Sequence, residues 1–387
     1  MRPVDALVLD TNNDTDSHVT LFTSVLKSKK KNESTGDGRG DKEVMKELKT
    51  TLSTIVALLC SITTIAHDFE ADGIYYNITS SEDLTVEVTY RGDDSYNSYS
   101  NEYTGEVSIP ENITYNGNTY SVIRIGEGAF YGCSSLMNIK IPNSVTNVGK
   151  NAFQACSNLT SITIPSSVTS IGEGAFSSCT CLTSITLPNS VINIDSYTFA
   201  YCSSLTTVNI PSSVTNIGEA AFRSCSSLMN INIPNSVTSI GGGAFAHCSS
   251  LTNINIPNSV TNVGKNAFQA CSNLTSITIP SSVTSIGEGA FDGCTCLTSI
   301  TLPNSVINID SYTFAYCSSL TNIILPNCVT NIGKEAFAHC SSLTDITIPN
   351  SVTNIGEGAF QHCSNITNIT IPDYVTSIEN GMCFGCI

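Results

Sequence analysis

Cysteine is the residue type in this sequence with the greatest capacity for chemistry. The chain of 387 residues contains 17 cysteines, and 12 of them recur every 23 residues from Cys133 to Cys386. Cysteine thiolates act as nucleophiles and metal ligands, and paired cysteines form disulfides. If the repeats stack as coils, neighbours in this column lie about 5 Å apart, which is within disulfide range. An inward position favours a ladder of reduced thiols, since free cysteine packs as a small apolar residue.

The remaining cysteines and the histidines do not suggest a metal site. Cys181 and Cys296 each complete a Cys-x-Cys pair, but zinc requires four converging ligands. His247, His339 and His362 share one repeat position, two residues after a phenylalanine, and the last two belong to adjacent repeats. Two imidazoles without a carboxylate are a poor ligand set. The sequence therefore predicts no metal, no cofactor and no enzymatic activity.

Serine, threonine and asparagine fill most of the outward positions of the recurring segment Leu-x-x-Ile-x-Ile, where Met229 also stands and only Lys140 and Asp345 are charged. Hydroxyls and amides can hydrogen-bond to peptide or glycan, and they are also simply compatible with a solvated strand. They provide no acid–base pair or nucleophile. The predicted partner-binding residues are Thr160, Ser161, Thr163, Thr183, Ser184, Thr186, Thr207, Asn209, Asn230, Asn232, Asn253, Asn255, Ser276, Thr278, Ser299 and Thr301.

These positions belong to a repeat of 23 residues, Leu-x-x-Ile-x-Ile-Pro-x-Ser-Val-x-x-Ile-Gly-x-x-Ala-Phe-x-x-Cys-x-x. A fixed period of this length predicts a repeat solenoid, in which each coil buries its apolar face against its neighbours. Ile162 and Ile164 predict a short strand that stacks into a parallel sheet, and Pro165 ends it because proline lacks an N–H donor. Residues 173–179 predict a short helical turn that directs Phe176 inward.

The chain divides into four predicted segments. Residues 1–44 are either disordered or an extension that precedes a true start at Met45. Residues 45–66 resemble a signal peptide, with a basic start, an apolar stretch and Ala66 before the expected cleavage site. That apolar stretch is too short to span a bilayer, so we expect no membrane insertion after cleavage. Residues 67–120 form a β-rich cap, and residues 121–387 form the solenoid of about 11–12 coils.

The cap is predicted from a change in pattern. Residues 73–78, 84–90 and 105–110 read GIYYNI, LTVEVTY and GEVSIP, which alternate in polarity and predict antiparallel strands. Asn116-Gly117 stands between two further strand-like halves and predicts a two-residue hairpin turn. Such a β-rich segment would cover the apolar edge that the first coil of a solenoid exposes.

Charge argues against two classes of partner. The formal net charge is −16, and residues from 67 onward contain 23 acidic and 7 basic side chains. An acidic surface of this kind repels phosphate backbones and anionic headgroups. We therefore exclude nucleic acid as a partner.

The array also contains an internal duplication. Residues 143–206 and 258–321 are identical except that Ser177-Ser178 becomes Asp292-Gly293. Growth by copying whole coils suits a scaffold whose binding surface scales with its length. It suits poorly an enzyme with one fixed set of catalytic residues.

The repeat over residues 121–386 resembles the BspA-like leucine-rich repeat family, also called the Treponema pallidum type. The segment HDFEADGIYYNI at residues 67–78 is similar to the start of secreted members from anaerobic, host-associated bacteria. The resemblance implies a right-handed, curved solenoid that is exported to the cell surface. Members act as adhesins toward host extracellular-matrix proteins or other microbes, and the family motif itself carries no catalytic or binding residue.

These observations together predict a secreted or cell-surface protein that binds an extracellular protein or glycan. The leading hypothesis is an adhesin that engages host matrix proteins or other cells through the strand face. The alternatives are a glycan-binding module and a structural surface-layer protein. The ligand, the mode of attachment to the cell and the oligomeric state are left open.

Overall fold

The computed structural model describes residues 67–91 and 102–386. The chain divides into two units, residues 1–63 and 64–387, and all of the described residues belong to the second unit. The predicted extension at residues 1–44 and the predicted signal peptide at residues 45–66 lie outside the described residues.

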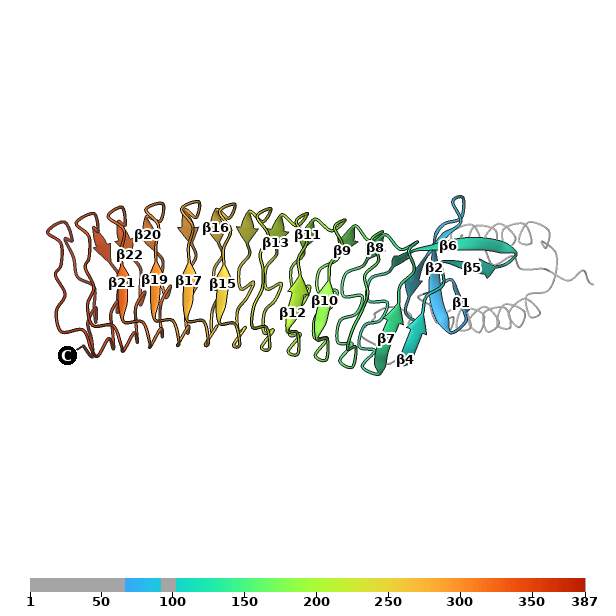
Figure 1. The fold of residues 1–387 in the computed structure, drawn as a ribbon, viewed down its shortest axis with the longest axis horizontal. Coiled ribbons are helices and arrows are strands. Elements are labelled where there is room, and N and C mark those ends of the chain that lie inside the picture. Colours follow the sequence, from blue (N-terminus) through green and yellow to red (C-terminus); the bar gives the residue numbers. More distant parts are fainter. Residues whose placement is uncertain (1–66, 92–101, 387) are drawn as a thin grey trace, which may run out of the picture. The chain divides into compact units, whose positions relative to one another are not determined.

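A regular coil of the array contains two short strands followed by a run of turns, and a few coils have only the second strand, so the strands form two rows along the array (Figure 1). The first row lies in the Ile-x-Ile segments, where β10 pairs with β12 in parallel and Ser184 lies opposite Thr207. The first-row strands of the coils are β7 (Leu136–Lys140), β10 (Ser184–Thr186), β12 (Thr207–Asn209), β15 (Asn253–Asn255), β17 (Ser276–Thr278), β19 (Ser299–Thr301) and β21 (Asn322–Ile324).

The second row follows the Val-x-x-Ile segments and is again parallel, with Asn193 opposite Asn216. Its members are β8 (Asn147–Val148), β9 (Ser170–Ile171), β11 (Asn193–Ile194), β13 (Asn216–Ile217), β14 (Ser239–Ile240), β16 (Asn262–Val263), β18 (Ser285–Ile286), β20 (Asn308–Ile309), β22 (Asn331–Ile332) and β23 (Asn354–Ile355). Partners in the two rows are 23 residues apart, which confirms the predicted solenoid and its period.

The predicted helical turn at residues 173–179 is wrong, because this segment forms consecutive turns and the described residues contain no helix. Gly174 and Ser178 have positive φ values of 63° and 60°, which a right-handed helix does not allow. Alternate N–H groups instead donate to the next coil, as Phe176 N does to Thr198 O at 2.9 Å. The turns therefore form a third ladder of hydrogen bonds between coils.

The core of the array is a set of ladders made by identical residue types. Every phenylalanine from Phe130 to Phe360 is fully buried, and adjacent rings lie nearly parallel with centroids 5.0–5.6 Å apart. Columns of Leu, Ile, Val, Ala and Cys fill the rest of the interior. Because each side chain packs on its own counterpart in the neighbouring coils, every repeat is complementary to the next.

The cap strands are β1 (Phe69–Ala71), β2 (Ile74–Ser80), β3 (Thr85–Thr89), β4 (Gly105–Ser108), β5 (Asn112–Tyr115) and β6 (Asn118–Ile125). β1, β2 and β3 pair antiparallel in that order, and β5 pairs antiparallel with β6. The predicted hairpin turn between β5 and β6 is confirmed, since Asn116 and Gly117 have φ values of 48° and 79°. Two positive φ values are the requirement of a type I′ turn.

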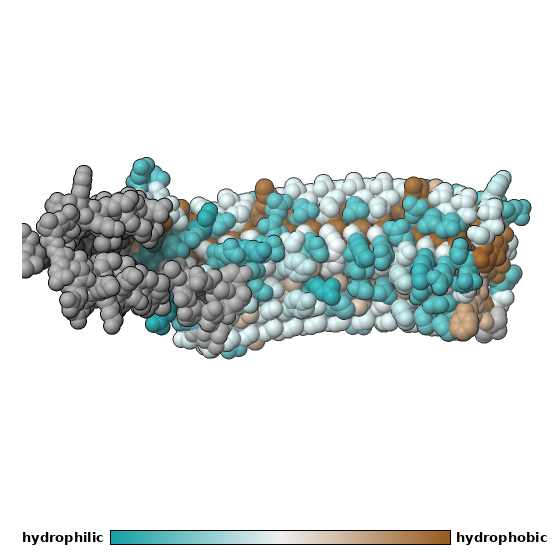
Figure 2. Space-filling view, turned by 180° about the vertical axis from the view of Figure 1, so that it is seen from behind, coloured by the Kyte–Doolittle hydropathy of each residue, from teal (hydrophilic) through white to brown (hydrophobic). Residues whose placement is uncertain are grey.

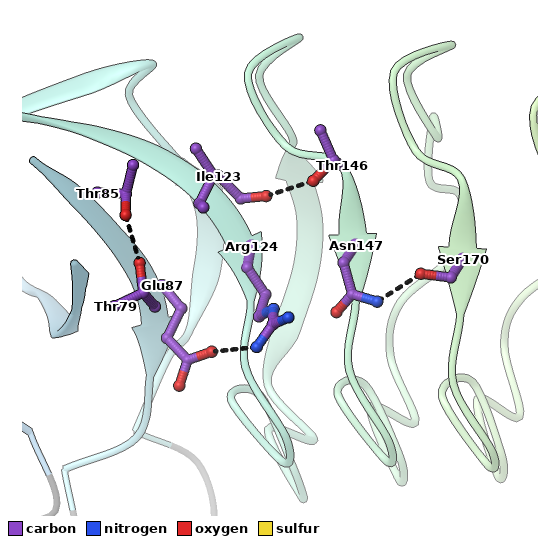
Figure 3. Close-up of polar contacts among 8 residues, drawn as sticks. All are labelled: Thr79, Thr85, Glu87, Ile123, Arg124, Thr146, Asn147 and Ser170. Carbon is purple, nitrogen blue, oxygen red and sulfur yellow. Dashed lines mark hydrogen bonds and ion pairs between the residues drawn. The ribbon is translucent and has the colours of Figure 1, made fainter. Parts of the chain in front are cut away.

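The cap joins the array through parallel pairs, which the sequence did not predict. β3 pairs in parallel with β6, and β6 continues in parallel to β8, so the cap sheet runs into the second strand row. The prediction of an antiparallel strand at Gly105–Ser108 is wrong, because β4 pairs in parallel with β7. Side chains also link neighbouring strands of this sheet (Figure 3). Arg124 Nη1 of β6 lies 3.8 Å from Glu87 Oε2 of β3, and Asn147 Nδ2 of β8 donates to Ser170 Oγ of β9 at 2.5 Å.

The last described coil departs from the pattern. Residues 364–386 contain no strand, and the large side chains of Tyr374, Ile378 and Phe384 are exposed. Apolar side chains gather at this end of the array (Figure 2). The regular part of the solenoid, residues 121–363, is therefore the part that can position a binding surface.

Candidate functional site

We use the name strand face for the outward side chains of the Leu-x-x-Ile-x-Ile segments. Along each segment the leucine and both isoleucines are buried, and the residues between them point to solvent. Parallel pairing aligns these outward residues in columns that run through successive coils, because partners such as Thr186 and Asn209 share one register. The strand face is thus three columns wide. Each column is named after its member in the coil that begins at Leu159, which gives the Thr160, Ser161 and Thr163 columns.

The structure exposes all sixteen predicted binding residues. Thr160, Ser161 and Thr163 belong to one coil, and the other thirteen residues occupy the same columns in the coils up to Thr301. Neighbouring members lie directly opposite one another in the ladders, as Thr278 and Thr301 do. The prediction placed these residues together, and their role in binding stays a prediction.

Hydrogen bonding distinguishes the Thr160 column from the Thr163 column. In the Thr160 column the hydroxyls donate to the backbone of the preceding coil, for example from Thr206 Oγ1 to Thr183 O at 3.0 Å and from Thr275 Oγ1 to Thr252 O at 3.2 Å. In the Thr163 column no side chain forms a hydrogen bond with another described residue. The Thr160 column therefore serves the packing of coils, and the Thr163 column has its hydroxyls and amides available for a partner.

The sequence analysis gave no role to the apolar residues that interrupt this polar surface. Met137, Met229 and Ile324 are 59%, 57% and 74% exposed on the strand face. Exposed methionine and isoleucine supply apolar contact area, which hydroxyl groups cannot provide. Their signal was present in the repeat alignment, because each stands in a column otherwise occupied by polar residues.

The cysteine column lies inside the solenoid and hydrogen-bonds to it. Cys225 Sγ donates to Phe199 O at 3.1 Å, and Cys156 Sγ donates to Phe130 O at 3.0 Å. All cysteines of the described residues are free. Burial raises the pKa of Cys202 and of Cys271 to about 12, so both thiols stay protonated at neutral pH. A protonated, buried thiol is a poor nucleophile, which agrees with a packing role.

The histidine column gives ring stacks. His339 and His362 lie in adjacent coils with ring centroids 4.7 Å apart, as the sequence suggested they could, and Tyr316 stacks on His339 at 4.4 Å. Among residues 67–91 and 102–386, no group of three or more His, Cys, Asp or Glu side chains is arranged to hold a metal ion. In the same part of the chain, no helix is long and apolar enough to cross a membrane.

A second surface feature lies in the turn segments of four successive coils. It is a groove of about 480 Å³, and its lining includes Thr180, Tyr201, Ser203, Arg223, Ser224 and His247. The sequence analysis considered His247 only as a metal ligand and did not identify this groove. The sequence does contain a signal for this groove. In the column two residues after each phenylalanine, Ser224 stands between Tyr201 and His247, which both carry rings.

Comparisons with known proteins agree with this architecture. The family model described as BspA type leucine rich repeat region (6 copies) matches residues 97–229, 151–275, 224–314 and 261–387. A leucine-rich repeat protein from Bacteroides ovatus is 32% identical, with a TM-score of 0.56, covering 83% of this chain and 93% of that one. A leucine rich cell surface protein from Faecalibacterium prausnitzii is 30% identical, with a TM-score of 0.50, covering 78% of this chain and 93% of that one.

A leucine-rich repeat protein from Eubacterium ventriosum shares the fold at 23% identity, with a TM-score of 0.56 over 82% of this chain and 93% of its own. A search of curated proteins found no match. The family model matches most of the chain, from residue 97 to residue 387. The chain therefore belongs to the BspA type leucine-rich repeat family.

Proposed function

We propose that this chain is an exported, non-enzymatic protein that binds other proteins at the cell surface, acting as an adhesin through its strand face. The observation that carries the proposal is the Thr163 column, whose hydroxyls and amides are exposed, aligned by the sheet and unpaired with other described residues. A rigid, repeated set of donors and acceptors matches the repeated groups of an extended polypeptide.

Two further features support protein binding. The strand face is almost free of charge in a chain of net charge −16, so a partner meets little electrostatic repulsion there. The exposed side chains of Met137, Met229 and Ile324 add apolar contacts. Interfaces between proteins combine such apolar contacts with about one hydrogen bond per 100–200 Å² of buried area.

The comparisons support the cellular location. The Faecalibacterium prausnitzii relative is described as a cell surface protein, and this chain covers 93% of it at 30% identity. A surface location agrees with the predicted signal peptide at residues 45–66. We infer that the array is displayed outside the cell, where host matrix proteins or neighbouring cells are the available partners.

The test is binding of the full chain to immobilised fibronectin and other matrix proteins, measured by surface plasmon resonance. The variant carries Lys at Thr163, Thr186, Thr278 and Thr301, which places four charges on the Thr163 column. The expected result is saturable binding by the wild type and at least a 10-fold loss of affinity in the variant. That loss corresponds to about 1.4 kcal/mol, which is less than the several kcal/mol that an unpaired charge buried at an interface commonly costs.

The matched control carries Lys at Asn193, Asn262, Ser285 and Asn308, which are exposed positions of the second strand row. It adds the same charge away from the strand face and should bind like the wild type. Equal loss of binding in both variants would contradict a role for the strand face. No binding to any matrix protein by the folded wild type would favour a glycan ligand or self-assembly instead.

A further inference from the structure

The groove in the turn segments contains a gap in a column of rings. The column two residues after each phenylalanine reads Ser178, Tyr201, Ser224, His247 and Ala270 in five successive coils. Ser224 is the only small residue of this column that has a ring-bearing neighbour on both sides. Tyr201, Ser224 and His247 all line the groove.

The backbone is regular through this gap. Tyr201, Ser224 and His247 have φ values of 63°, 58° and 61°, so their side chains leave the backbone in the same direction. The ladder of hydrogen bonds also continues, with Tyr201 N to Arg223 O and Ser224 N to Ala246 O both at 2.7 Å. Only the middle ring is missing, and the structure keeps its place open.

The second half of the array shows the same column with the gap filled. The duplication repeats Tyr201 as Tyr316, but the next two positions are His339 and His362. Their rings stack in sequence at 4.4 Å and 4.7 Å. Twice this spacing predicts that the ring centroids of Tyr201 and His247 lie roughly 9 Å apart. A ring placed between them would lie roughly 4.5 Å from each centroid, which is a favourable stacking distance.

Arg223 adds an unpaired cation to the groove. The other turn-segment cations have carboxylate partners in the next coil, at 3.3 Å for Lys150 and Glu173 and at 3.1 Å for Lys265 and Glu288. Among the described residues, Arg223 has no ion pair. Its Nη1 would lie 3.8 Å from a Cβ added to Gly243, so the guanidinium reaches the next coil, which also contains His247.

Hydroxyl groups form the remaining wall. Ser203 Oγ and Ser226 Oγ donate to carbonyl oxygens of the preceding coils at 3.5 Å and 3.3 Å. Their lone pairs stay available, so this wall accepts hydrogen bonds from a ligand. Burial, and then the charge of Arg223, lower the pKa of His247, and the carboxylate of Asp292 acts in the opposite direction.

We propose that the slot between Tyr201 and His247 binds a pyranose ring that carries a carboxylate. The two rings would hold the faces of the sugar, the serine wall would accept its hydroxyl protons, and Arg223 would pair with the carboxylate. An aromatic side chain could enter the slot but would offer no hydroxyl donors to the serine wall. This site is separate from the strand face, so either proposal can fail without the other.

The test uses the full chain with methyl glucuronide and methyl sialoside as acidic probes. Methyl glucoside, which lacks the carboxylate, is the neutral control. Binding is followed by saturation-transfer NMR and titration calorimetry. At least one acidic sugar should bind, and roughly 10-fold more tightly than the glucoside, as expected for one charge-assisted hydrogen-bonded pair. R223A should reduce the acidic sugar to the level of the glucoside.

Two variants test the slot itself. S224H should abolish binding by completing the ring stack, and it should fold because His339 and His362 occupy this column with the same φ. S178H adds the same side chain outside the slot and should bind like the wild type. The double variant A338R and H339S should open an equivalent slot between Tyr316 and His362 and raise the stoichiometry from one sugar to two.

Several results would overturn the proposal. It fails if neither acidic sugar binds, if S224H binds as well as S178H, or if N-acetylphenylalanine binds in place of the sugars. Loss of sugar binding in the strand-face lysine variant would also contradict it, because that variant leaves the groove untouched.

Discussion

Individual glycines set how closely the coils approach. Gly218, Gly241 and Gly264 follow the isoleucine or valine of the second strand row, and a Cβ on Gly241 would lie 2.6 Å from the carbonyl carbon of Gly218. Real Cβ atoms do not approach backbone atoms this closely, so a side chain added at Gly241 requires the local backbone to shift. Asp195, Asp310 and Glu379 replace this glycine in three coils. In the two aspartate coils threonine also replaces alanine, and its hydroxyl donates to the aspartate carbonyl, at 2.7 Å for Thr198.

The neighbouring glycine provides a matched control for this effect. We expect G241A to lower the free energy of unfolding by about 1–3 kcal/mol, the usual cost of overpacking. G242A should change it by less than about 0.5 kcal/mol, because a Cβ there meets its nearest atom, Lys265 O, at 3.4 Å. Thermal unfolding followed by circular dichroism measures both, and similar melting temperatures for the two variants would contradict the close-approach argument.

At the scale of elements, the cap ends the phenylalanine ladder with one tyrosine. Tyr103 is 3% exposed, and its ring centroid lies 4.6 Å from that of Phe130, the first phenylalanine of the column. Its hydroxyl donates to Thr89 O at 2.7 Å and accepts from Tyr75 N at 3.1 Å. One side chain therefore covers the first ring of the array and ties it to β2 and β3.

Substitution of Tyr103 separates these two contributions. Y103F keeps the ring and loses the hydrogen bonds, so we expect a destabilisation of about 1–2 kcal/mol. Y103A uncovers Phe130 as well and should cost about 3–5 kcal/mol. Hydrogen exchange would localise the effect to the cap and the first coils, and equal destabilisation by both variants would show that the ring itself contributes nothing.

At the scale of the whole molecule, the array is held by contacts between neighbouring coils. The strand ladders, the turn ladder and the ring stack all join residues of adjacent coils. Stability in such a protein is a sum of coil and interface contributions, with no contact that needs a distant coil. The number of coils is therefore free to vary, which agrees with the internal duplication of residues 143–206.

Deletions of different length test this modularity. Removing residues 258–280 takes out one full period and joins Pro257 to Ser281, so every column stays in register. We expect this variant to keep its β-sheet circular dichroism spectrum and a cooperative melt. Removing residues 258–269 shifts all later columns by about half a coil and should destroy the fold beyond the junction. If both deletions unfold the protein, long-range contacts must be essential.

The sequence by itself determined the solenoid, its period, its inward columns and the polar strand face. Each follows from residue types at one fixed spacing, since a column in sequence becomes a ladder in space whenever equal coils stack. The same logic predicted the hairpin, because Asn116-Gly117 suits two positive φ values regardless of its surroundings.

Only the tertiary structure decided the rest. A helical turn and the observed turns at residues 173–179 place the same apolar residues inward, and hydrogen bonds to the next coil, far in sequence, select between them. The parallel partner of β4 and the free hydroxyls of the Thr163 column also depend on contacts between coils. The open place between Tyr201 and His247 exists only once three coils are stacked, because a missing ring becomes a slot only when both of its neighbours lie opposite it.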